Sequence, residues 1–182
     1  MSSINNVNNW LTSNRICINA NKTKYMIFSY SKLLHLTNSK IGSASIEETN
    51  NIKFMGIIFD KHLTFKNHIA VIARNISKSV GILFKLSKYL PLAIIKTYYS
   101  LINHFLLYGI EVWHGTYANI TNKTFILQKN VCRAIHNLPF NIHTTEYFKN
   151  SKFLKLTDLH ESQISKHVFK CLNLNTNILL QH

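Results

Sequence analysis

The sequence is poor in acidic residues. Its 182 residues include 7 Asp and Glu against 21 Lys and Arg, which gives a formal net charge of +14. Only 2 Pro and 5 Gly are present, which excludes collagen-like and low-complexity chains. The longest apolar stretch, from Tyr98 to Trp113, is interrupted by Asn103, His104 and Glu111, so it is too polar to span a bilayer. What remains is a basic chain whose 46% apolar residues suffice for a packed core.

Cysteine is also scarce. Cys17, Cys132 and Cys171 are odd in number and far apart, which predicts no disulfide framework. A reducing compartment is the default for such a chain, and we expect an intracellular protein, in the nucleus or the cytoplasm. Cys132 and His136 lie four residues apart on an expected helix, but one helical pair supplies two of the four ligands that structural zinc needs. We therefore expect no metal site.

The few acids are scattered along the chain: Glu47, Glu48, Asp60, Glu111, Glu146, Asp158 and Glu161. Metal-dependent phosphoryl transfer needs at least two carboxylates that converge on ions about 3.5–4 Å apart. Only Glu47 and Glu48 are neighbours, and adjacent residues of a strand point to opposite faces. We expect that the chain does not build a two-metal centre by itself.

The charge excess predicts a polyanionic partner, and nucleic acid is the most common one. An anionic membrane surface or simple solubility is the alternative. The expected helix faces are too ordinary to favour a membrane, so we expect nucleic acid as the partner, with no membrane and no small-molecule substrate for the chain alone.

The apolar pattern predicts an α+β fold: a small antiparallel sheet with one helix, followed by a mostly α-helical lobe. We expect a short helix over 4–14, followed by three or four strands. One strand lies at 25–28, two form a hairpin that turns near Gly42 and pairs 34–38 with 44–46, and another lies at 52–59. Apolar residues then recur every three or four positions, which predicts helices over 65–86, 91–108, 121–138 and 157–172. We place the domain boundary between residues 60 and 61.

The helix expected over 65–86 carries Arg74, Lys78 and Lys85 at spacings of one and two turns, with Lys88 close by. Such a row fits contacts along a sugar–phosphate backbone, which position a duplex and weaken as salt rises. The alternative is a solvated helix face. We favour nucleic-acid contact because almost no acid compensates these cations, and Arg133 on a later helix is a further candidate.

An ordered series of segments resembles the reverse transcriptases of non-LTR (LINE) retrotransposons, in particular the jockey-like members. The segment 10–29 contains Asn19, Lys22 and Thr23 in the spacing of that family's motif D. The segment 54–60 resembles motif E, the primer-grip hairpin, with Met55 in place of the usual Leu. Later segments resemble the family's thumb, at 107–113, 127–135 and 143–159.

The resemblance implies the end of a polymerase palm in residues 1–60 and a helical thumb or connection region in 61–182. The family's Ala-Asp-Asp strand turn lies upstream of the segment matched here. The resemblance therefore implies part of an RNA-directed DNA polymerase that binds a primer–template of RNA and DNA and is inactive alone. The resemblance implies Mg²⁺ only for the complete polymerase, so we expect no cofactor for this chain alone. It also implies the upstream palm and fingers as a further partner. The alternative is a domesticated or remnant basic module that binds nucleic acid or protein without a polymerase role.

Four more residues are candidates through this resemblance. Lys22 matches the motif D lysine, which lies near the departing pyrophosphate in a complete polymerase. Alternatively, Lys22 and Lys24 flank a solvated loop. Phe54 and Gly56 fall in motif E, where a Gly within an apolar run marks a bulge or the close approach of another backbone, here the primer strand. For Phe54 itself we favour a place in the core over stacking on a nucleic acid.

Overall fold

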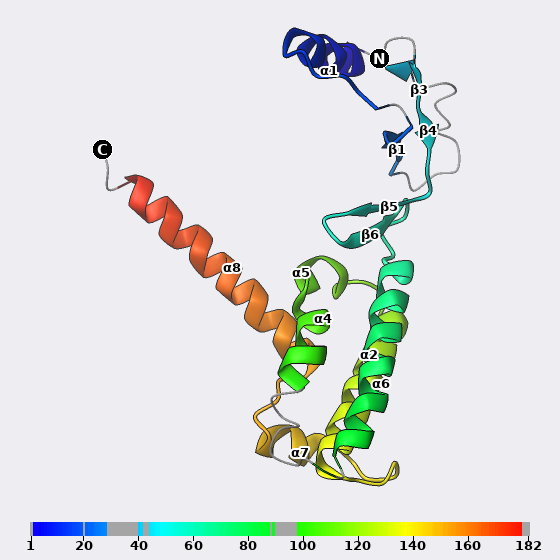
Figure 1. The fold of residues 1–182 in the computed structure, drawn as a ribbon. Helices are drawn as coiled ribbons and strands as arrows, with labels where there is room; N and C mark the ends of the chain where they lie inside the picture. Colours follow the sequence, from blue (N-terminus) through cyan, green and yellow to red (C-terminus); the bar gives the residue numbers. More distant parts are fainter. Residues whose placement is uncertain are drawn as a thin grey trace. The chain divides into compact units, whose positions relative to one another are not determined.

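The structure is a computed structural model that describes residues 2–19, 21–28, 40–41, 44–87, 89 and 98–179. The chain divides into two compact units, Met1–Thr64 and Phe65–His182. The first combines a helix with short strands and the second is helical, so the predicted α+β fold class is confirmed (Figure 1).

The first unit begins with helix α1 (Ser2–Ser13) and continues as short strands joined in pairs. The strands β2 (Lys40–Ile41) and β3 (Ala44–Ser45) form an antiparallel pair, as do β5 (Asn51–Phe54) and β6 (Ile57–Asp60), whereas β1 (Lys24–Tyr25) and β4 (Glu47–Glu48) run parallel. Parallel pairing becomes possible because more than a dozen residues separate these two strands. An antiparallel hairpin at 44–46 was predicted, but β3 pairs with 40–41 and not with the predicted segment 34–38. The strand predicted over 34–38 and the turn predicted at Gly42 lie outside the described residues.

The single strand predicted over 52–59 is wrong. This run folds into the β5–β6 hairpin, in which Ile52 pairs with Phe59 and Phe54 with Ile57. The turn consists of Met55 and Gly56, whose φ angles are 44° and 80°. Positive φ at both central positions is the requirement of a type I′ turn, whose twist matches the twist of the two strands.

The second unit contains α2 (Lys66–Leu86), and a π-helical turn η1 (Tyr99–Asn103) that runs into α4 (His104–Leu107). It continues with α5 (Ile110–Trp113), α6 (Ala118–His136), α7 (Thr145–Asn150) and α8 (Leu156–Leu179).

The predicted long helices correspond to α2, α6 and α8. The predicted helix over 91–108 is described only from residue 98 on, where the chain is helical as far as Leu107. The helix predicted over 121–138 runs from Ala118 to His136, where Asn137 adopts φ 51° and ends it. Helix α7 was not predicted.

The core of this unit forms where α2 packs against α6 (Figure 1). Buried residues of α2 recur at helical spacing: Ile69, Ile72, Ile76, Val80 and Leu83. Trp113 is also fully buried, and its indole Nε1 donates a hydrogen bond to the Tyr108 carbonyl, 3.0 Å away. The Gln128 amide donates from Nε2 to the Leu154 carbonyl at 2.9 Å, which ties the segment before α8 to α6.

In the part of the chain that the structure describes, no helix combines the length and the apolar character needed to cross a membrane.

We predict that Ile76→Ala destabilises the second unit by about 2–5 kcal/mol, because it removes a fully buried side chain and leaves a cavity. Ile82→Ala on the same helix is the matched control, since Ile82 is 48% exposed and its loss should change stability within about 0.5 kcal/mol. Urea unfolding followed by circular dichroism measures both. Equal effects of the two substitutions would contradict the packing described for α2.

We also predict that this unit loses stability as the pH falls below about 6.5. Burial lowers the pKa of His68, His114 and His136, and for His114 the charge of His160 adds to the lowering. The unfolded chain therefore takes up protons before the folded chain does, so stability is complete above the unfolded pKa and declines as the pH falls through it. The urea midpoint should be lower at about pH 5 than at about pH 8.

The control for this prediction replaces single histidines. His114→Asn should reduce the difference between the two midpoints, whereas His143→Asn, at an exposed position, should leave it unchanged. A midpoint difference that His114→Asn does not alter would show that this histidine does not carry the effect.

Candidate nucleic-acid interface

The three cations predicted on one helix face lie together on α2. Arg74, Lys78 and Lys85 are all exposed, on the side opposite the buried row that packs against α6. We call them the basic stripe. With a rise of about 1.5 Å per residue, they extend over roughly 16 Å of helix. Lys88, predicted beside them, lies outside the described residues.

The charge of the basic stripe is not compensated locally. Helix α2 carries four Lys and Arg and no acid, and α6, against which it packs, carries no acid either. Within the described residues, none of the three cations forms an ion pair. A row of like charges without counter-charges attracts a polyanion, and it can meet successive phosphates along a strand.

Arg133 on α6 is placed differently from the basic stripe. It is half-buried, and its guanidinium donates hydrogen bonds to Asn130 Oδ1 at 3.0 Å and to the Ile142 carbonyl at 3.3 Å. These contacts hold the segment that follows α6. The Arg133 side chain therefore makes contacts within the fold and is not part of the basic stripe.

In the first unit, the β5–β6 hairpin presents an apolar tip. Phe54 is 59% exposed and Met55 is 75% exposed, so neither side chain belongs to the core. Gly56 completes the turn, and Lys53 on β5 is exposed beside it. Lys53 was not predicted as a candidate, and Met55 was noted only as a departure from motif E, although the Met-Gly dipeptide within an apolar run could have indicated a turn.

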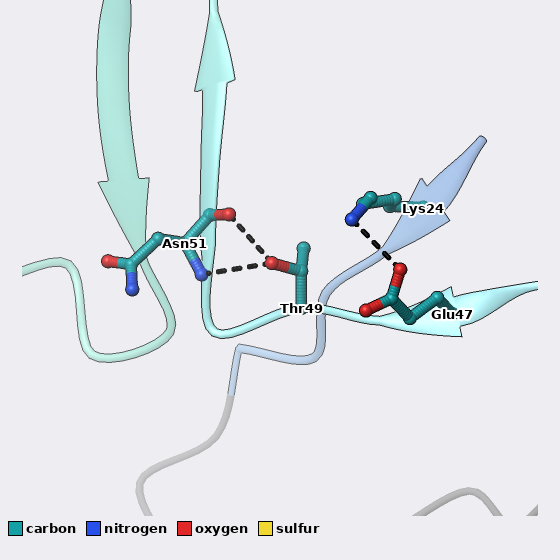
Figure 2. Close-up of polar contacts among 4 residues, drawn as sticks. All are labelled: Lys24, Glu47, Thr49 and Asn51. Carbon is teal, nitrogen blue, oxygen red and sulfur yellow. Dashed lines mark hydrogen bonds and ion pairs between the residues drawn. The ribbon is translucent and has the colours of Figure 1, made fainter. Parts of the chain in front are cut away.

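Lys22 and Lys24 lie at either side of the entry to β1. The Lys24 ammonium is 2.9 Å from Glu47 Oε2, across the β1–β4 pair, in an exposed ion pair worth little energy (Figure 2). Lys22 closes a turn in which its backbone N–H donates to the Asn19 carbonyl at 3.0 Å, and its side chain is exposed. Nearby, the Thr49 hydroxyl donates to the Asn51 carbonyl at 2.8 Å and fixes the step from β4 to β5 (Figure 2).

Asp60 illustrates how the few acids are used. One of its carboxylate oxygens, Oδ1, accepts hydrogen bonds from the backbone N–H groups of His62 and Thr64, at 3.2 and 3.0 Å. The other accepts from the Thr64 hydroxyl at 3.0 Å. This carboxylate therefore shapes the turn that ends the first unit. In the described ranges, no three His, Cys, Asp or Glu residues gather as metal ligands.

The pair Cys132 and His136 is likewise engaged within the fold. Cys132 is buried, and burial raises the pKa of its thiol to about 11. The His136 imidazole Nε2 forms a hydrogen bond with the Ser151 hydroxyl, which connects α6 to the end of α7. The two residues thus stabilise this end of the second unit.

Comparison with known proteins finds related sequences in mobile elements of flies. The chain is 25% identical over 153 residues to the RNA-directed DNA polymerase from mobile element jockey of Drosophila funebris, covering 82% of this chain and 17% of that protein. The jockey polymerase of Drosophila melanogaster is 24% identical over 174 residues, covering 93% of this chain and 19% of that protein. A probable RNA-directed DNA polymerase from transposon BS of the same species is 26% identical over 157 residues, with 82% and 17% covered.

The chain spans less than a fifth of the length of the curated relatives it matches. No protein-family model matches it, and no solved structure does. The similarities support a reverse-transcriptase-like relationship, which confirms the predicted resemblance at that level. The assignment of single segments to motif D, motif E and the thumb stays a prediction.

We predict that Met55→Asn stabilises the β5–β6 hairpin by about 1 kcal/mol, because an L-residue other than Asn, Asp or Gly is disfavoured at positive φ. Backbone amides of β5 and β6 should then exchange their hydrogens more slowly. Met55→Val is the opposite control, since a β-branched residue tolerates this backbone poorly and should accelerate exchange. Unchanged exchange in both variants would contradict the observed turn.

Proposed function

We propose that the chain is part of a reverse-transcriptase-like polymerase and binds primer–template nucleic acid, with the basic stripe on the sugar–phosphate backbone. The observation that carries the proposal is the acid-free, exposed face of α2 in a chain similar to RNA-directed DNA polymerases. Contacts of this kind position a duplex without reading its sequence. RNA and DNA are then the partners of this chain.

We assign the first unit to the end of a polymerase palm and the second to a thumb or connection region. The turn from Asn19 to Thr23 corresponds to motif D, and the β5–β6 hairpin corresponds to motif E. Exposed Phe54 and Met55 at the hairpin tip suit contact with a primer strand, because apolar and aromatic side chains pack against sugars and bases. Lys22 acts on leaving pyrophosphate only where a metal-bound triphosphate is held nearby.

We further propose that these 182 residues do not polymerise nucleotides by themselves. Asp60 is committed to a turn, and Glu47 is paired with Lys24. The chemistry would require carboxylates from another segment, which makes a palm and fingers portion a partner. Purified protein that adds nucleotides to a primer, as its template directs, would overturn this part of the proposal.

Binding to a primer–template duplex at several salt concentrations tests the role of the basic stripe. The logarithm of the association constant should fall against the logarithm of salt with a slope of about −0.9 for each phosphate neutralised. Replacing Arg74, Lys78 and Lys85 together by Ala should make this slope shallower by about 2.7, because three phosphate contacts are lost.

The control removes the same charge elsewhere in the second unit. Lys123→Ala, Lys149→Ala and Lys170→Ala, all at exposed positions, lower the net charge equally and should change the slope far less. A slope near zero for the unchanged protein would refute nucleic-acid binding. Equal effects of the two triple variants would show that total charge, and not the basic stripe, governs the affinity.

A further inference from the structure

The second unit contains a hollow of about 200 Å³ between the η1–α4 segment, the residues that precede α8, and one face of α8. The α8 residues that line it include Ser162, Gln163 and Lys166, which lie one helical turn apart or less. Lys152 and Asn103 line it from the other elements. Among the described residues that line the hollow, none is acidic.

The polar groups of the hollow are available to a ligand. Asn103, Ser162 and Gln163 are half-buried, and their side chains form no hydrogen bond with any other residue that the structure describes. Each carboxamide offers two donor hydrogens and an acceptor oxygen. Half-buried polar groups without an internal partner are satisfied by water or by a ligand with matching donors and acceptors.

The remaining surfaces of the hollow are apolar or cationic. Phe153 and Tyr98 are buried beneath it, with ring centroids 4.4 Å apart. Lys152 and Lys166 are exposed at its border. The φ of 57° at Lys152 belongs to the left-handed turn that ends α7, where the Phe153 N–H donates to the Phe148 carbonyl at 2.9 Å.

We propose that this hollow binds one unpaired nucleotide, with the base on the carboxamide side and the phosphate on Lys152 and Lys166. Asn and Gln pair well with the edges of bases, and unpaired bases are the usual target of such contacts. The volume is below the roughly 300–1,000 Å³ of pockets for drug-sized ligands, so it suits a single base and not a larger molecule. The inference rests on the proposed function and adds to it a site for single-stranded nucleic acid.

The test compares a blunt duplex with the same duplex carrying a short single-stranded overhang, using the full 182-residue chain. The overhang should increase the affinity about three- to tenfold, which corresponds to one or two new hydrogen bonds. A 2-aminopurine in the overhang should change its fluorescence on binding. Gln163→Glu keeps the side-chain shape, removes the carboxamide donor that would meet the base and adds a negative charge inside the site, so it should abolish the gain while leaving blunt-duplex affinity nearly unchanged.

Lys78→Ala is the matched control, because it should weaken both ligands by the same factor. Blunt-duplex binding without any overhang gain would overturn the hollow as a nucleotide site and leave the proposed function standing. Loss of all duplex binding would overturn both. Circular dichroism of Gln163→Glu, and the double variant Asn103→Ala with Gln163→Ala, separate loss of the site from loss of the fold.

Titration with free adenosine monophosphate distinguishes the two sources of such a nucleotide. If the nucleotide comes from a strand, the overhang binds with the gain described and the free nucleotide binds far more weakly. A different set of results would assign the hollow to free nucleotides and make the strand assignment wrong. In that case free adenosine monophosphate binds, Gln163→Glu prevents this binding, and the overhang gives no gain.

Discussion

Burial of one apolar row of α2 against α6 is the constraint that places the charges of the second unit. Ile72, Ile76 and Leu83 lose their contact with water in this packing, and the helical period then leaves Arg74, Lys78 and Lys85 on the opposite side. Isoleucine is stiff at χ1 in a helix, so the buried row also fixes the rotation of α2 about its axis. Hydrophobic burial and the direction of the positive charge are therefore two results of the same sequence pattern.

How much of the fold could be predicted depends on how local the signal is. Helix α2 was predictable because its apolar residues repeat over about six turns, and no single residue decides the assignment. The apolar pattern predicted one strand across the hairpin at Met55-Gly56, because the run around it is mostly apolar and Met is not a usual residue of a type I′ turn. Only the resemblance to motif E pointed to a hairpin there. The parallel β1–β4 pair could not be predicted, since the pairing of two-residue strands far apart in sequence leaves no periodic trace.

The candidate site shows the same division between local and distant information. The spacing of Arg74 and Lys78 predicts one helix face, and the structure places both side chains on the exposed face. Arg133 is also a helical cation, yet its hydrogen bond to the Ile142 carbonyl depends on how the chain returns after α6. Asp60 likewise accepts hydrogen bonds within a turn that composition could not reveal. Residue type and spacing indicate which groups are available, whereas their partners are set by tertiary structure.

Because the thiol of Cys132 is buried, its reactivity reports conformational opening around α6. Thiol reagents react with the thiolate, and this side chain is both shielded and held protonated in the folded unit. Cys17 and Cys171 are exposed, so thiol reagents should reach both while the fold is intact. The rate at which a third equivalent of alkylating reagent reacts would thus measure how fast α6 separates from its neighbours, without any engineered label.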